Sequence, residues 1–122
     1  MRAFRLNGAT ESLSLVEEVD PQPGGGEVLI DLKAATLNYR DLIVKEGRYG
    51  GDQRDELIPL SDGAGVISAV GQGVSTDRVG ERVAIGFMPR WTEGPFSAAK
   101  QADALGGGYV DGVLAEKILV PA

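Results

Sequence analysis

Short strand-like segments separated by turn-forming residues are the feature that most constrains the fold of this chain. In each segment apolar and polar residues alternate or β-branched residues run together, and Gly, Pro, Asp or Asn stand at the ends. This pattern is typical of strands that bury one face. The six expected strands span residues 3–6, 13–19, 28–35, 65–70, 82–87 and 114–120. We therefore expect a mainly β protein, folded as a barrel or a sandwich.

Two short helices are expected between these strands. Residues 39–46 carry Leu42 and Ile43 among charged side chains, and Gly47 follows as a residue that ends helices. From residue 88 to residue 112, two prolines and a glycine triplet interrupt any periodicity, so only residues 97–105 are suited to a second helix. Loops of this length are uncommon in compact domains and are often functional.

Length and charge indicate one globular domain. A chain of 122 residues can bury roughly two-thirds of its unfolded surface in a single core. No uncharged apolar run approaches the ~20 residues of a membrane span, and no apolar block of signal-peptide length follows the first residues. The net charge of −6 and the scattered basic residues argue against a nucleic-acid partner. We expect a cytoplasmic protein with no membrane partner.

The sequence contains no cysteine and no histidine. It therefore lacks the usual ligands of zinc, and we expect no tightly bound zinc and no other metal site. Nucleophilic triads that need an imidazole are also unsupported. The Gly-Ala-Gly at residues 63–65 lacks the last glycine of a dinucleotide fingerprint and precedes a strand instead of a helix. Tight backbone packing explains these glycines better.

Four short motifs occur in a fixed order along the chain. They are Asn-Tyr-Arg-Asp at 38–41, Pro-Leu-Ser-Asp-Gly-Ala-Gly-Val at 59–66, Gly-Glu-Arg-Val at 80–83 and Gly-Val-Leu-Ala-Glu at 112–116. Together they resemble the GroES-like catalytic domain of the medium-chain dehydrogenase/reductase superfamily, and most closely its zinc-independent alcohol dehydrogenases and quinone oxidoreductases. The resemblance covers essentially all of residues 1–122. It implies a GroES-like, partly open β-barrel with one or two short helices, and a nucleotide-binding Rossmann domain that is absent from this chain.

The resemblance also suggests where the site lies. In zinc-dependent relatives the position matching Asn38 is a cysteine that binds catalytic zinc, and the position matching Ser61 is a histidine ligand followed by an acidic residue, here Asp62. Zinc-independent relatives carry Asn-x-x-Asp at the first position, and this chain matches that pattern with Asn38 and Asp41. A plainer interpretation is that Asn38 caps the helix and Asp41 favours its positive end.

Without a metal, hydrogen-bond donors have to stabilise the charge that develops on a substrate oxygen. The amide of Asn38 can do so, and Tyr49, which matches a Gly-x-Tyr of many relatives, could act as the general acid. With Asp41, these residues form the expected catalytic set, and Asn38 is also the expected cofactor contact. The expected substrate contacts are Tyr39, Ser61, Asp62 and Trp91. Tyr49 could instead pack over the core, and Trp91 could anchor its loop.

The resemblance implies the substrate-side catalytic domain of an NAD(P)H-dependent, zinc-independent oxidoreductase. Such an enzyme would reduce a carbonyl, enone or quinone, or oxidise an alcohol, and it could form a homodimer when full length. The absent Rossmann domain would bind most of the NAD(P)H, so we expect the isolated domain to be inactive. The alternative is a stand-alone GroES-like binding or assembly module without catalytic activity, in which aromatic residues of the loop at 88–112 engage the partner.

Overall fold

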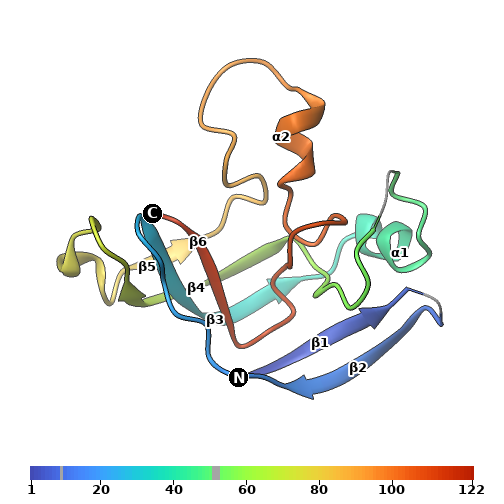
Figure 1. Ribbon diagram of the computed structural model, residues 1–122, viewed down its shortest axis with the longest axis horizontal. Coiled ribbons are helices and arrows are strands. Elements are labelled where there is room, and N and C mark those ends of the chain that lie inside the picture. The colour runs from blue at the N-terminus through green and yellow to red at the C-terminus, as the bar shows by residue number, and fades with distance from the viewer. Residues whose placement is uncertain (9, 51–52) are drawn as a thin grey trace.

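The computed structural model describes residues 1–8, 10–50 and 53–122. Within these ranges the strands form a two-stranded sheet, β1-β2, and a four-stranded sheet with the order β5-β4-β3-β6 (Figure 1). All neighbouring strands are antiparallel. The elements are β1 (Arg2–Asn7), β2 (Ser12–Glu17), β3 (Glu27–Thr36), α1 (Tyr39–Lys45), β4 (Asp62–Val70), the 3₁₀ helix η1 (Thr76–Arg78), β5 (Arg82–Ala84), α2 (Ala98–Ala102) and β6 (Lys117–Pro121). The described strands form no closed barrel, so the expected mainly β, partly open GroES-like fold is confirmed.

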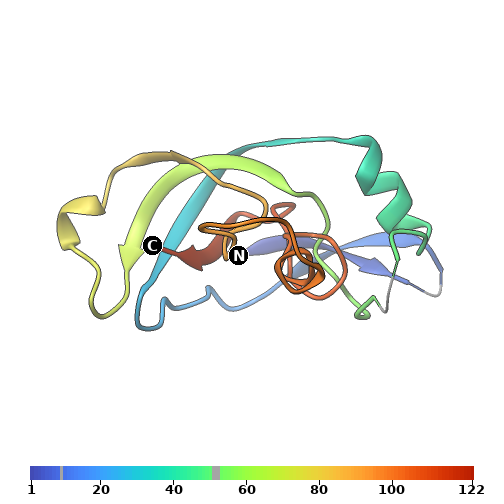
Figure 2. The same cartoon turned by 90° about the horizontal axis from the view of Figure 1, so that it is seen from above.

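The long pair β3 and β4 forms the centre of the larger sheet. Irregular register between Leu29 and Ile30, and again between Leu32 and Ala34, interrupts the pairing, and such bulges bend strands. Figure 2 shows the resulting curvature of both strands. A Cβ on Gly65 would lie only 2.2 Å from the carbonyl oxygen of Asp31, so the glycine allows the two strands to approach. Tight packing is thus the structural role of this glycine.

Two clusters of buried side chains hold the fold together. The larger cluster joins the four-stranded sheet to the segments around residues 60, 105 and 113, and contains Val28, Ile30, Leu60, Ile67, Leu105, Val113, Ile118 and Val120. The smaller cluster contains Leu6, Val44 and Leu57, with Tyr49 packed against it. Val44 is fully buried, so it attaches α1 to the β1 strand. Helix α1 is therefore fixed to the body of the domain by one apolar position.

The first helix ends as the sequence predicts. Gly47 follows α1 with φ +69°, and its amide donates to the carbonyl of Val44 at 3.0 Å. The amide of Arg48 donates to the carbonyl of Ile43 at 2.9 Å, which completes a Schellman motif. The second helix is shorter than expected, Ala98–Ala102 in place of residues 97–105, because Ser97 is its N-cap and Asp103 already is its C-cap.

The last two strands are also shorter than expected. Strand β5 ends at Ala84. The amide of Ile85 donates one more hydrogen bond to the carbonyl of Gly63, and the chain then leaves the sheet. Strand β6 begins at Lys117. The residues before it bond to other segments, with the amide of Leu114 donating to Pro59 and the amide of Glu116 to Arg2.

Residues 88–104 form a projection that we call the arm. It rises from the sheet and carries α2, as Figure 1 shows. At its base, the amide of Leu105 donates to the carbonyl of Phe87 at 2.8 Å, so the two ends of the arm are joined. No helix in the described part of the chain is long and apolar enough to cross a membrane.

Candidate active site

The junction between β3 and α1 positions the first motif. Asn38 has extended dihedral angles and is the N-cap of α1. The carboxylate of Asp41 accepts a hydrogen bond from the backbone amide of Asn38 at 2.7 Å, as in a capping box. Asn38 therefore occupies the N-cap position, and Asp41 binds its backbone amide. Asn38 also has a second role, because its side-chain amide makes a further contact.

Two side chains from distant motifs donate to one carboxylate. The Nδ2 of Asn38 donates a hydrogen bond to Oδ2 of Asp62, and the hydroxyl of Ser61 donates to the same oxygen at 3.1 Å. Ser61 is buried, while Asn38 and Asp62 are half-buried. Hydrogen bonds to an ionised acceptor are stronger than neutral ones. The contact thus brings together Asn38, Ser61 and Asp62, all three expected in the site.

Leu60 holds Ser61 and Asp62 in place through an unusual backbone conformation. This buried leucine has φ +72°, a region that a branched side chain rarely adopts. Its carbonyl accepts from the amide of Val113 at 3.0 Å, and a Cβ on Gly112 would lie 1.9 Å from the same oxygen. Strained residues of this kind persist only where their surroundings enforce them. The sequence carries no signal for this role of Leu60, because nothing in the motif at 59–66 distinguishes it from an ordinary core leucine.

Tyr49 lies against the guanidinium of Arg40. The Cζ of Arg40 lies 4.5 Å from the centre of the Tyr49 ring, and Nη1 of Arg40 donates to the carbonyl of Leu105 at 3.0 Å. Tyr49 also lines a pocket of about 280 Å³, together with Gly50, Ala98, Gln101, Ala102, Gly107 and Tyr109. The ring of Tyr49 is therefore packed against Arg40 and also borders this cavity. Arg40 stands in the first motif, but the sequence gives no signal that its partner is Tyr49.

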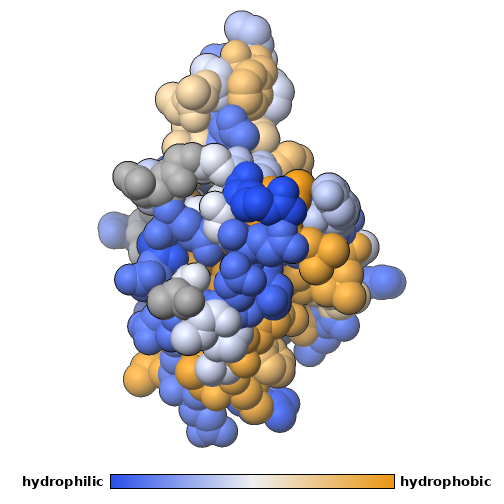
Figure 3. Space-filling view, turned by 90° about the vertical axis from the view of Figure 1, so that its right-hand side faces the viewer, coloured by the Kyte–Doolittle hydropathy of each residue, from blue (hydrophilic) through white to orange (hydrophobic). Residues whose placement is uncertain are grey.

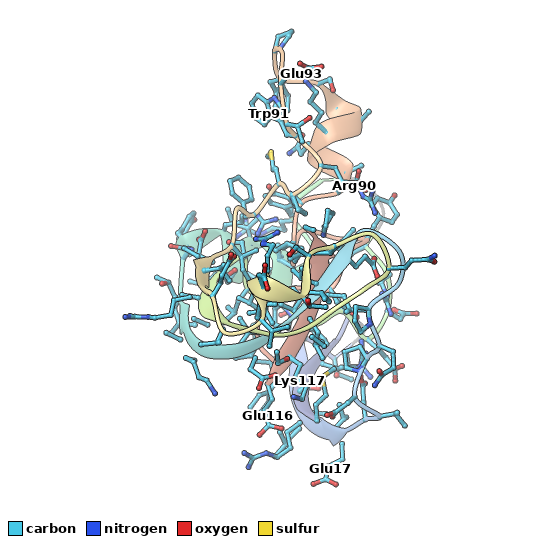
Figure 4. All side chains as sticks on the ribbon, turned by 90° about the vertical axis from the view of Figure 1, so that its left-hand side faces the viewer. Glu17, Arg90, Trp91, Glu93, Glu116 and Lys117 are labelled. Carbon is cyan, nitrogen blue, oxygen red and sulfur yellow. The ribbon has the colours of Figure 1, made fainter. Side chains whose placement is uncertain are left out.

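Tyr39 and Trp91 do not share these contacts. Tyr39 is 73% exposed at the start of α1. The indole of Trp91 donates to the carbonyl of Gly94 at 2.9 Å and meets the ring of Phe96 edge-on at 6.0 Å. Figure 4 places Trp91 on the projecting part of the arm. Trp91 thus anchors the arm, because its contacts with Gly94, Phe96 and Lys100 lie within the arm itself.

The donors in this region do not fit a zinc ion. Around Asp62 they are an amide, a hydroxyl and a carboxylate oxygen that already accepts two hydrogen bonds. Zinc sites use thiolate, imidazole and carboxylate ligands in tetrahedral arrangement, and of Asn38, Ser61 and Asp62 only Asp62 offers such a ligand. Among the residues that the structure describes, no three His, Cys, Asp or Glu side chains are grouped to hold a metal ion.

A second polar cluster fixes β1 to the loops beside it. Arg5 forms ion pairs with Glu18 and with Asp111, the latter at 3.3 Å. The side-chain hydrogen bond from Arg5 lowers the pKa of Glu18 below its ordinary value of 4.5. Asp111 also accepts from the backbone amide of Ile58 at 3.0 Å. This cluster supports the segment that leads into residues 59–62. The polar surface on the side of α1 and the β1-β2 sheet is visible in Figure 3.

Comparison with known proteins shows the family to which this domain belongs. The model of the alcohol dehydrogenase GroES-like domain matches residues 24–122. The chain belongs to this family, which lies within the medium-chain dehydrogenase/reductase superfamily. The resemblance inferred from the four motifs is confirmed.

Individual relatives agree with this assignment. A zinc-type alcohol dehydrogenase-like protein of Schizosaccharomyces pombe is 39% identical over 105 residues, which are 86% of this chain and 30% of that protein. The structure of a short chain alcohol dehydrogenase of E. coli CFT073 in complex with NADH is 31% identical, with a TM-score of 0.80 over 100% of this chain and 36% of that one.

A thermostable alcohol dehydrogenase of Pyrobaculum aerophilum, solved with cobalt and zinc, is 29% identical with a TM-score of 0.75. All of this chain aligns with that structure and covers 39% of its length. The chain therefore spans between 30% and 39% of the length of these relatives.

Proposed function

We propose that this chain is the substrate-side catalytic domain of an NAD(P)H-dependent, zinc-independent oxidoreductase. The observation that carries the proposal is the convergence of Asn38 and Ser61 on Asp62. At the positions where zinc-dependent relatives have metal ligands, this chain builds a hydrogen-bonded group instead. The family and the relatives named alcohol dehydrogenases support an oxidoreductase domain.

The proposed chemistry divides between cofactor and chain. The nicotinamide, when bound, supplies the hydride, and a second domain provides most of its binding site. In this chain Asp62 orients the amide of Asn38 so that its other hydrogen can be donated to a substrate oxygen or to the cofactor amide. The hydroxyl of Tyr49 delivers a proton to the substrate oxygen as general acid. Asp41 holds the start of α1, and thereby Asn38, in position.

The substrate in this proposal is a small carbonyl, enone or quinone, or an alcohol in the reverse direction. Ser61 and Tyr39 lie next to Asp62 and Asn38 in sequence and would contact it. The NADH in the E. coli relative supports a nicotinamide cofactor without deciding between NADH and NADPH. We place the enzyme in the cytoplasm and propose that the full-length form is a homodimer.

The test compares two proteins, the 122-residue chain and the same chain extended by the coding sequence that follows it. Oxidation of NADH and NADPH is measured with a panel of quinones, enones and aldehydes. Activity of the extended protein alone supports the proposal. If both proteins are inactive, or if the gene ends at Ala122, the stand-alone binding module becomes the better interpretation.

A further inference from the structure

Arg40 is held in the structure by aromatic faces and one carbonyl. Its Cζ lies 4.5 Å from the centre of the Tyr49 ring and 5.6 Å from that of the Phe87 ring. Its Nη1 donates to Leu105, while Nε and Nη2 are buried with no hydrogen-bond partner among the described residues. A planar guanidinium can lie flat against a ring while the N–H groups at its edge donate in the same plane, a shape that a tetrahedral ammonium lacks. The arrangement is therefore specific for arginine.

The contacts of Arg40 fall on both ends of the arm. Phe87 is the last residue before the arm and Leu105 is the first after it, and the amide of Leu105 donates to the carbonyl of Phe87. The guanidinium of Arg40 lies over the ring of Phe87 and donates a hydrogen bond to the carbonyl of Leu105. It therefore closes the base of the arm from the side of α1.

Tyr49 contacts the same guanidinium, so its position depends on the same group. The backbone leaves space for this stack, because a Cβ on Gly107 would lie 2.4 Å from Nη2 of Arg40 and 3.4 Å from the Tyr49 ring. A displacement of the arm that moved Phe87 or Leu105 would therefore be transmitted through Arg40 to Tyr49.

We propose that Arg40 is a positioning residue that holds Tyr49 and the base of the arm as one unit. The inference rests on the proposed function in one respect, since it assigns catalytic importance to the position of Tyr49. Its structural part, the coupling of the arm to Tyr49, can be measured without activity. The sequence offers a direct probe, because Trp91 is the only tryptophan and is anchored within the arm.

The first experiment uses the 122-residue chain. Time-resolved fluorescence anisotropy of Trp91 reports the motion of the arm, and ring resonances in NMR spectra report Tyr49, with the exposed Tyr39 as internal reference. Arg40→Leu and Phe87→Leu are expected to add a fast anisotropy decay and to shift the Tyr49 resonances. Arg40→Lys is expected to restore little of the original signal. The matched control is Arg2→Leu, which removes an exposed guanidinium paired with Glu116.

Unchanged Trp91 anisotropy and Tyr49 resonances in both Arg40→Leu and Phe87→Leu would overturn the inference. Phe87→Leu serves as the second variant should Arg40→Leu fail to fold, because Phe87 is 36% exposed.

The second experiment measures kinetics of the extended, active protein. Arg40→Leu is expected to lower kcat by about tenfold to a hundredfold with little change in KM, as misplacement of a catalytic group does. Normal kcat in Arg40→Leu alongside a deficient Tyr49→Phe would refute the positioning role and leave the proposed function intact. Normal kcat in Tyr49→Phe would instead refute the role of Tyr49 in the proposed function, and the anisotropy would still decide whether Arg40 couples the arm to that ring.

Discussion

The side-chain amide of Asn38 donates a hydrogen bond to the carboxylate of Asp62, which joins the residue before α1 to the first residue of β4. The two residues are separated by 24 positions and belong to different motifs. Because Ser61 donates to the same oxygen, the carboxylate is satisfied from two directions. This contact is the centre of the candidate site. It gives a physical reason for Asn38 in the first motif and for Ser61 and Asp62 in the second.

A double-mutant cycle measures the strength of that contact. Asn38→Ala and Asp62→Ala each disturb other interactions, including the helix cap, but the cycle isolates the pair. We expect a coupling free energy of about 1–2 kcal/mol from urea unfolding, since the hydrogen bond is half-buried and its acceptor is charged. The control cycle uses Arg78 and Glu81, an ion pair 3.0 Å apart at the surface, where we expect no more than about 0.5 kcal/mol. Equal coupling in the two cycles would contradict the account.

The strained turn at Leu60 depends on the absence of a side chain at Gly112. Gly112→Ala would place a Cβ 1.9 Å from the carbonyl oxygen of Leu60, so we expect a loss of about 2–4 kcal/mol in the free energy of unfolding. Gly86→Ala is the control, because nothing lies within 4 Å of its Cβ position, and its effect should stay within about 0.5 kcal/mol. Similar stability of both variants would show that residues 60 and 112 are not as tightly packed as described.

The Arg5–Glu18 ion pair predicts a dependence of stability on pH. The pKa of Glu18 is lowered in the folded protein from 4.5, chiefly by its hydrogen bond with Arg5. Its stabilising contribution is therefore complete above pH 4.5 and is lost as the pH falls through the lower, folded pKa. Glu18→Gln should be less stable than the original chain at about pH 7, and the difference should shrink below about pH 4. Urea unfolding across this range checks the prediction, and a difference that is constant with pH would refute it.

The donor set around Asp62 predicts indifference to zinc. The 122-residue chain, purified in the presence of zinc and then dialysed, should contain far less than one zinc per molecule by elemental analysis. Treatment of the active extended protein with a chelator should leave kcat unchanged. Stoichiometric zinc in the 122-residue chain would overturn the proposed zinc independence.

Much of the fold could be predicted because strands and turns have local signals. The helix end at Gly47 followed from glycine's tolerance of positive φ, which the structure shows at +69°. The ends of β5 and β6 could not be predicted in the same way. Residues 114–116 have a strand-like pattern but bond to Pro59 and Arg2, which are distant in sequence.

For the candidate site, the motifs singled out Asn38, Ser61 and Asp62, which the structure brings together, but not how they bond. The stacking of Arg40 between Tyr49 and Phe87 had no sequence signal, because it arises where three separate segments meet. The same holds for Leu60, whose left-handed backbone packs directly against Gly106 and Gly112. Tertiary constraints of this kind lie outside the local patterns that sequence analysis can use.

The measurement that tests the central claim most directly is kcat of the extended protein carrying Asn38→Ala or Tyr49→Phe, with Arg2→Leu as control. If this chain supplies the groups that stabilise and protonate the substrate oxygen, each variant should lose about a hundredfold in kcat while the control keeps its activity. Full activity in both variants would contradict the account and show that the chemistry is performed elsewhere in the protein.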